Sequence, residues 1–193
     1  MKIKCLMIVA VFAVLLGCSD VSELYILDAI QESKPNYIMN GDFEKYEEVV
    51  DNSYPGWIFD KSKIDQVTID TLRSMTGEMS LKILQPKQEM QIISDAFEVY
   101  HRNAYGIKLS AKSLLKKVPI NINFITFNES GKIMSKYTST VIITTNWDTF
   151  YFKCDFLKSR SSYARVFLTI PKNDSVVLLD DISCMNIIKY QKK

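Results

Sequence analysis

The feature of this sequence that most restricts its fold is a two-residue alternation of apolar and polar side chains along most of the chain. In residues 105–111, Tyr, Ile, Leu and Ala alternate with Gly, Lys and Ser, and in residues 120–124 Ile, Ile and Phe alternate with two Asn. A period of two, rich in β-branched and aromatic residues, is typical of strands with one buried face. Because long helical periodicity is missing, we predict an all-β chain.

Turn signals separate these strands at fairly even intervals. Clusters rich in Asn, Asp, Gly and Pro occur at residues 40–41, 52–56, 76–77, 128–131 and 172–174, and such clusters favour turns. Many short strands at even spacing predict an antiparallel β-sandwich. The expected strands are residues 37–44, 63–70, 80–84, 89–99, 105–111, 120–128, 137–144, 149–156, 163–170 and 176–185.

The N-terminus has the pattern of a secretory signal peptide. Lys2 and Lys4 precede an apolar run, residues 5–16, which is too short for a membrane-spanning helix of about 20 residues. The run ends in Leu-Leu-Gly-Cys, which resembles the lipobox of bacterial lipoproteins and implies lipidation of Cys18. The alternative is an ordinary secretion signal with a chance Cys. We expect a signal peptide at 1–17, a lipidated tether at 18–35 and a β-sandwich domain at 36–190.

Charge and length limit the partners of the mature chain. The sequence has 24 Lys and Arg against 22 Asp and Glu. Cleavage would remove Lys2 and Lys4 and no acidic residue, so the mature protein would be formally neutral. A neutral chain argues against a nucleic-acid partner, which normally requires a basic patch. We expect contact with the membrane through the N-terminal lipid only, in the bacterial cell envelope and most simply at the outer membrane, on either its periplasmic or its surface face.

Two cysteines, Cys154 and Cys184, remain in the folded domain once Cys5 leaves with the signal and Cys18 is lipidated. Outside the cytoplasm such a pair can form a disulfide. Each also lies on the apolar side of a strand pattern, where a buried free thiol is equally suitable. The sequence leaves both alternatives open.

Six short segments in the correct order resemble β-sandwich carbohydrate-binding modules with a galactose-binding-like jelly roll. The segments are Asn-Tyr-Ile-Met-Asn-Gly-Asp-Phe-Glu at 36–44, Pro-Gly-Trp at 55–57, Gly-Glu-Met-Ser-Leu-Lys-Ile at 77–83, the strand at 105–113, Thr-Asn-Trp-Asp-Thr-Phe at 145–150 and Val-Leu-Leu-Asp-Asp-Ile at 177–182. The resemblance covers residues 36–188 and implies the fold. It implies sugar binding less strongly, because this fold carries many functions.

The resemblance also implies a structural calcium ion where the first and last strands meet. Ca²⁺ prefers six to eight oxygen ligands, several of them anionic. The candidate ligands are Asp42, Glu44, Asp180 and Asp181. The alternative is that Glu44 caps a turn and that only one Asp faces inward, where it forms a salt bridge. Trp57 and Trp147 could stack on sugars, but the positions they match usually pack against the core.

The strand alternation predicts a candidate binding face. If the strands at 120–128, 149–156 and 163–170 share one sheet, their polar sides form one surface. That surface would carry Asn121, Asn123, Tyr151, Lys153, Tyr163, Arg165 and Phe167. Aromatic rings beside amides and a guanidinium suit stacking and hydrogen bonding with sugars. The alternative is a solvated face with ordinary cross-strand aromatic pairs.

Catalysis is not expected. His101 is the only histidine, no nucleophile motif accompanies it, and no pair of carboxylates has a spacing that suggests glycoside hydrolysis. We therefore predict a lipid-anchored module that binds a glycan without chemistry. The alternative function is an accessory subunit of an envelope complex, in which the same sandwich binds a protein partner.

Overall fold

The computed structural model describes residues 36–45, 53–101, 103–155 and 157–187. The chain divides into two units, Met1–Lys34 and Pro35–Lys193, and the described residues all belong to the second. The predicted signal peptide, Cys18 and the tether therefore lie outside the described residues. In the part of the chain that is described, no helix is long and apolar enough to cross a membrane.

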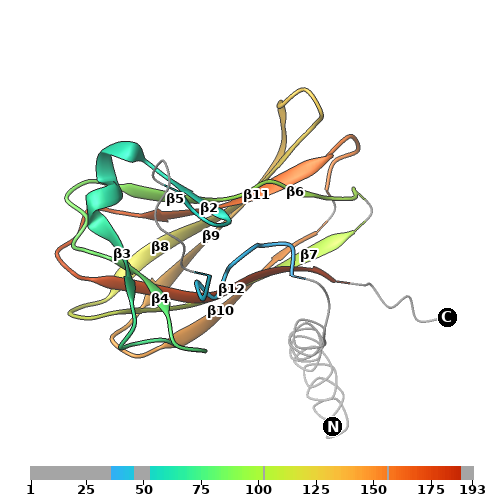
Figure 1. The fold of residues 1–193 in the computed structure, drawn as a ribbon. Coiled ribbons are helices and arrows are strands. Elements are labelled where there is room, and N and C mark those ends of the chain that lie inside the picture. Colours follow the sequence, from blue (N-terminus) through green and yellow to red (C-terminus); the bar gives the residue numbers. More distant parts are fainter. Residues whose placement is uncertain (1–35, 46–52, 102, 156, 188–193) are drawn as a thin grey trace, which may run out of the picture. The chain divides into compact units, whose positions relative to one another are not determined.

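The described residues form two antiparallel sheets that lie face to face (Figure 1). Sheet A has the order β1-β2-β5-β11-β8-β9, with β6 paired to β11, and sheet B has the order β10-β7-β12-β4-β3. The elements are β1 (Ser53–Tyr54), β2 (Trp57–Phe59), η1 (Lys61–Gln66), β3 (Val67–Asp70), β4 (Ser80–Ile83), β5 (Met90–Ser94), β6 (Phe97–Glu98), β7 (Ala104–Ser113), β8 (Val118–Phe127), β9 (Ile133–Ile143), β10 (Asp148–Cys154), β11 (Tyr163–Ile170) and β12 (Val177–Ile187).

The core lies between the sheets and follows from the alternation. Ile120, Ile122 and Phe124 on β8 are fully buried, and so are Leu109 of β7 and Leu179 of β12 on the opposing sheet. Removing this apolar surface from water stabilises the sandwich by about 25 cal/mol per Å² buried. The predicted all-β antiparallel sandwich is confirmed.

The predicted first strand, residues 37–44, is wrong: the chain from Asn36 to Lys45 runs in turns. Asn36 accepts a hydrogen bond from Ile38 N (3.0 Å), and Asn40 accepts one from Lys45 N (2.9 Å). Asn40 and Phe43 have positive φ angles of 50° and 57°, which an extended strand does not allow. Asn side chains that bond nearby backbone compete with strand formation.

The cysteines are buried free thiols. Cys154 is opposite Tyr105 on β7, and Cys184 is opposite Ile107 on the other edge of the same strand. Two strand spacings, roughly 9.5 Å, separate their strands, more than the roughly 7 Å that a disulfide can bridge between Cα atoms. Burial raises the pKa of both thiols. The free-thiol alternative is therefore the one the structure supports.

Candidate functional site

The expected binding face is divided between the two sheets. β8 and β11 are hydrogen-bonded neighbours in sheet A, where Asn123 is opposite Phe167. β10 pairs with β7 in sheet B, where Tyr151 is opposite Lys108. The assumption that the three strands share a sheet is therefore wrong for β10. Alternation shows which side of a strand is polar, but not which sheet the strand joins.

The outward side of sheet A brings the remaining candidates together. Because antiparallel partners lie side by side, the residues of β9, β8, β11 and β5 form transverse rows. We call the surface formed by three rows the amide face. Its rows are Thr140–Asn121–Thr169–Gln91, Thr138–Asn123–Phe167–Ile93 and Lys136–Ile125–Arg165.

Each asparagine of the amide face is held by a threonine of β9. Thr138 Oγ1 donates to Asn123 Oδ1 (2.9 Å), and Thr140 Oγ1 donates to Asn121 Oδ1 (2.7 Å). Among the described residues, neither Nδ2 atom donates a hydrogen bond. Both side chains are thus fixed through their acceptor oxygen, and each keeps two N–H donors. Asn121 is half-buried, whereas Asn123 is 9% exposed.

Aromatic side chains continue this surface. Phe167 lies half-buried between Asn123 and Ile93, so part of its ring remains accessible. One row beyond Arg165, Tyr163 stacks on Phe127, with ring centroids 5.2 Å apart and planes inclined by 14°. Arg165 Nη1 donates to Ser94 O (3.2 Å). That contact uses one of five guanidinium donors and fixes the side chain against sheet A.

Beyond Tyr163 the loops enclose a hollow of about 360 Å³. It is lined by Asn128, Glu129, Ser130, Arg160 and Ser162. Gly131 turns the β8–β9 connection with a φ of 79° and passes close to Tyr163 Oη. The strand pattern of the sequence did not predict this hollow. The turn cluster at 128–131 was the available signal, but the opposing loop that carries Arg160 comes from a distant part of the sequence.

Tyr151 and Lys153 lie on the outward side of sheet B. Lys153 pairs with Asp155, with Nζ and Oδ2 2.9 Å apart. Trp57 is fully buried and donates from Nε1 to Asn40 O (3.0 Å), so the packing role expected of it is confirmed. Trp147 is half-buried, and Lys112 Nζ lies 5.9 Å from the centroid of its ring.

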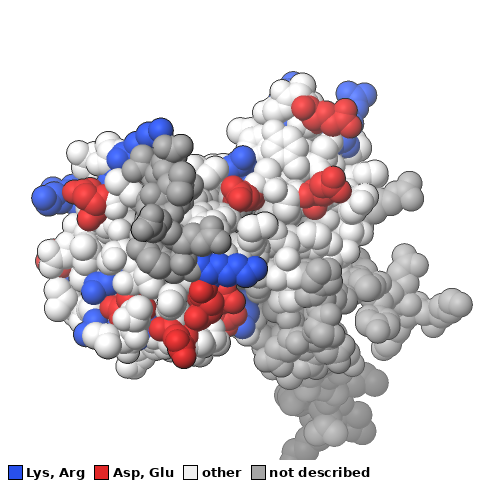
Figure 2. All heavy atoms as spheres, in the orientation of Figure 1, with Lys and Arg blue, Asp and Glu red and all other residues white. Residues whose placement is uncertain are grey.

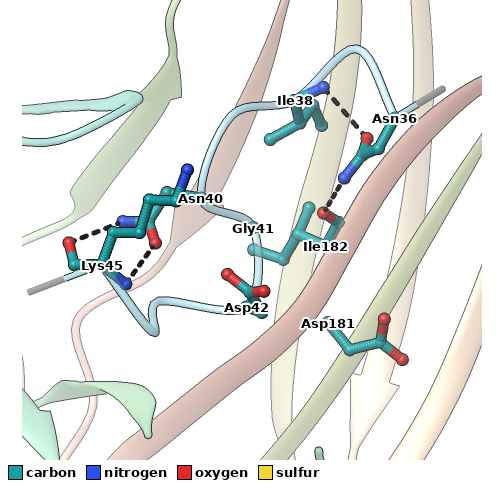
Figure 3. A pocket seen from close by; sticks show the side chains of 8 residues that line it. All are labelled: Asn36, Ile38, Asn40, Gly41, Asp42, Lys45, Asp181 and Ile182. Carbon is teal, nitrogen blue, oxygen red and sulfur yellow. Dashed lines mark hydrogen bonds between the residues drawn. The ribbon is translucent and has the colours of Figure 1, made fainter. Parts of the chain in front are cut away.

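Only two of the four predicted calcium ligands lie at a second hollow, of about 220 Å³ (Figure 3). Asp42 and Asp181 line this hollow together with Lys45, and their carboxylates point in different directions (Figure 3). Asp181 forms an ion pair with Lys108. Within the described ranges, no three His, Cys, Asp or Glu side chains are placed to hold one metal ion. Calcium binding stays a prediction.

Glu44 and Asp180 bind the loop between β3 and β4 instead. Glu44 Oε1 accepts from Glu78 N (2.7 Å) and Met79 N (2.8 Å), and it fills the space that a Cβ at Gly77 would need. Asp180 Oδ2 accepts from Met75 N (2.7 Å) and Thr76 N (2.9 Å). The turn-capping alternative for Glu44 matches this geometry. Only Asp180 of the two neighbouring aspartates is buried, as that alternative expects, but it accepts backbone hydrogen bonds, and the ion pair is formed by Asp181.

Charges of both signs are interspersed on the side of the molecule shown in Figure 2. Six ion pairs join described residues, and four of them involve a residue on a strand of sheet B. No single-sign field dominates this view, as expected of a chain with nearly balanced charges.

No protein-family model matches the chain, and no curated protein matches it significantly. Solved structures do. TmCBM61, in complex with beta-1,4-galactotriose, is 14% identical with a TM-score of 0.57, and the match covers 79% of this chain and 99% of that one. The family 11 carbohydrate-binding module from Clostridium thermocellum, in complex with a beta-1,3-1,4-mixed-linked tetrasaccharide, is 11% identical with a TM-score of 0.52, covering 82% and 100%.

A third similar structure belongs to a larger protein. The enzymatically active domain of bacteriophage CBA120 tailspike protein 4 is 12% identical with a TM-score of 0.60. The match covers 79% of this chain but only 21% of that one. At these identities the likeness establishes the fold and leaves function to the site. The chain has the jelly-roll sandwich fold that is also found in carbohydrate-binding modules.

Proposed function

We propose that this chain is a lipid-anchored protein of the bacterial cell envelope that binds a glycan without catalysis, and that the amide face is its sugar site. One observation carries the proposal: Asn121 and Asn123 are fixed by threonines through their oxygens, and their amide nitrogens have no partner among the described residues. Unpaired donors in fixed positions at a surface are suited to ligand hydroxyls.

The chemistry of the face fits a sugar. Hydroxyls can accept from the two amide groups and from the free guanidinium donors of Arg165, while Phe167 offers an apolar surface beside Asn123. Fixed side chains lose little rotamer entropy on binding, which favours affinity. Modules of the same fold have been solved with galactotriose and with a mixed-linked tetrasaccharide bound. That likeness makes a glycan the first class of ligand to test.

The anchor rests on the sequence. Lipidation at Cys18 would tether the sandwich to a membrane through the segment before residue 36 and would display its binding face there. The outer membrane is the expected site of attachment. Metabolic labelling with a lipid analogue, with Cys18→Ser as the control, tests this part separately: labelling of wild type alone is expected.

A protein partner is the alternative function, and the surface favours it less. The most exposed large apolar side chains among the described residues lie on separate elements. Leu72 follows β3, Leu115 follows β7, and Ile133 begins β9. A protein-binding subunit should instead show one continuous apolar patch of several hundred Å².

The test is a glycan array probed with the full-length chain in mild detergent, using two matched variants. Phe167→Ala removes an aromatic side chain from the amide face, and Tyr151→Ala removes one from the outward side of sheet B. We expect binding to fall roughly tenfold or more in Phe167→Ala, as for a central anchor residue, and to stay unchanged in Tyr151→Ala. Equal loss in both variants, or loss in Tyr151→Ala alone, would refute this site.

A further inference from the structure

The hydrogen-bonding groups that the amide face leaves free are mainly donors. The Oδ1 atoms of Asn121 and Asn123 already accept from Thr140 and Thr138, which leaves four amide N–H groups. Arg165 uses one N–H on Ser94 O and retains four more. A ligand that matches this face must therefore present acceptors.

The two charged side chains in the three rows are both cationic, so they too favour a ligand that carries acceptors. Lys136 and Arg165 are opposite Ile125 on its two sides, in one transverse row. Neither takes part in an ion pair among the described residues. Two strand spacings, roughly 9.5 Å, separate their backbones. The face thus carries two uncompensated cations close to its free amide donors.

One acidic residue, Asp95, follows Ser94 at the Arg165 end of the third row, but it forms no ion pair with Arg165. The other acidic residues near the face lie outside the three rows. Glu98, on β6, is opposite Tyr163 one row beyond Arg165, and Glu89 precedes β5 at the other end. The contrast with sheet B is clear, because Lys82, Lys108 and Lys153 there are each paired with an aspartate. The fourth lysine on the strands of sheet B, Lys112, lies against the ring of Trp147. Each strand lysine of sheet B thus has a partner, whereas the two cations of the amide face have no anionic one, which is consistent with a ligand that supplies anions.

We propose that the ligand of the amide face is an anionic glycan, one whose sugars carry carboxylate or sulfate groups. This inference rests on the proposed function and adds the chemical class of its ligand. Charge-assisted hydrogen bonds from Arg and Lys to such groups are shorter and stronger than neutral ones, and guanidinium can bind a carboxylate or sulfate in a bidentate manner. The neighbouring amides would bind the hydroxyls and ring oxygens of the same sugars.

The experiment compares polymers that differ only in charge, with the full-length chain in mild detergent. One pair is polygalacturonate and the same polymer after carboxyl reduction, and the other is dextran sulfate and dextran. We expect the charged member of at least one pair to bind roughly tenfold more tightly, with affinity falling as salt rises from 50 to 500 mM (about a tenfold change in ionic strength). The pair that shows the difference identifies the anionic group.

Variants then place the effect on the face. Lys136→Gln and Arg165→Gln should each weaken binding of the charged polymer about five- to tenfold, because each removes a charge-assisted hydrogen bond. Arg165→Lys, which keeps the charge, should retain part of the affinity that Arg165→Gln loses. Lys117→Gln, an exposed lysine in the β7–β8 turn, is the matched control and should bind normally. Melting curves show whether Arg165→Gln is folded, and Lys136→Gln decides the matter if it is not.

The outcomes separate this inference from the proposed function. Equal binding of charged and neutral polymers would overturn the anionic ligand and keep glycan binding. Equal loss in Lys117→Gln and Lys136→Gln would show non-specific charge attraction and also overturn it. Failure to bind any glycan on the array or in these pairs would overturn both.

Discussion

The outward sides of the two sheets use their polar residues differently. On sheet B, Asp70 pairs with Lys82, Asp181 pairs with Lys108, and Asp180 accepts from the β3–β4 loop. On sheet A, Asn121 and Asn123 are held from one side only and keep free donors. Polar groups that bond one another contribute to stability, whereas groups fixed but unsatisfied are available to a ligand.

This difference separates two kinds of mutation. Changes on sheet B should lower the free energy of unfolding and leave ligand affinity alone. Changes on the amide face should lower affinity and leave stability nearly unchanged.

Asp180→Ala should give the largest loss of stability. The carboxylate is fully buried and accepts backbone hydrogen bonds from Met75, Thr76 and Asp181. Its removal leaves three N–H groups without a partner, a cost of about 3 kcal/mol in the free energy of unfolding. Urea denaturation at pH 5 measures the change. Asp42→Ala is the control, since Asp42 is exposed and accepts one long bond, from Glu44 N (3.4 Å). Equal effects would show that the β3–β4 loop does not depend on Asp180.

The pH dependence of stability should distinguish Asp180 from Asp70. Burial raises the pKa of Asp180 to about 6, against the opposing effect of its N–H donors. Although burial opposes it, the Leu72 N–H and Lys82 lower the pKa of Asp70. A raised pKa means that the folded state holds the proton more tightly, so this contribution favours folding at low pH and is lost as pH rises through about 6.

The Asp70 contribution has the opposite sign. It is present above the unfolded pKa of about 3.9 and is lost on acidification. Because the Asp180 contribution is lost as pH rises through about 6, the free energy of unfolding of the wild type should fall between pH 4 and 7. The fall should be on the order of 2 kcal/mol relative to Asp180→Ala. Unfolding free energies of wild type, Asp180→Ala and Asp70→Ala measured across this range test the sign. A difference between wild type and Asp180→Ala that stays constant with pH would contradict it.

Asn121→Ala should weaken glycan binding about three- to tenfold, the weight of one or two hydrogen bonds to a neutral ligand. The matched change on sheet B is Thr149→Ala, which breaks the 2.9 Å contact between Thr149 Oγ1 and Ser110 Oγ. Titration calorimetry with the best glycan from the array should show a loss in the first variant alone. Normal affinity in Asn121→Ala would mean that its free donors serve no ligand.

Calcium removal should have the smallest effect. Glu44 and Asp180 are occupied by backbone N–H groups and Asp181 by Lys108, so no bound ion is needed to neutralise them. The predicted ion should raise the melting temperature by only a few degrees in millimolar Ca²⁺ relative to EDTA, and Asp42→Ala should abolish this rise. Equal melting temperatures in EDTA and in Ca²⁺ would refute the calcium site.

Local pattern in the sequence was sufficient for much of the fold. The alternation placed Ile120, Ile122 and Phe124 in the core and Asn121 and Asn123 on the opposite side of the strand, as the structure has them, although Asn123 is itself buried there. It did not assign β10 to sheet B, because β10 pairs with β7, whose residues lie about 40 positions earlier. Sheet membership depends on such distant pairings, which the period of one strand does not contain.

The alternation of apolar and polar residues also did not reveal the side-chain hydrogen bonds. Asn36 and Asn40 bond nearby backbone and hold residues 36–45 in turns, where alternation predicted a strand. Similarly, the β-bulge between Asp180 and Ser183, with Asp181 at a φ of 49°, turns the two neighbouring aspartates to different partners. The resemblance to carbohydrate-binding modules grouped these carboxylates around one ion. Their separate partners became evident only with the backbone in place.

Glycan binding at the amide face is tested most directly by a nuclear magnetic resonance titration with the glycan that binds most tightly on the array. If glycan binds there, the side-chain amide signals of Asn121 and Asn123 and the ring signals of Phe167 should shift with a common dissociation constant. The signals of Tyr151 and Lys108 should stay in place. Shifts confined to β7 and β10, or to the loops around Arg160 with the two asparagines unmoved, would contradict glycan binding at this face.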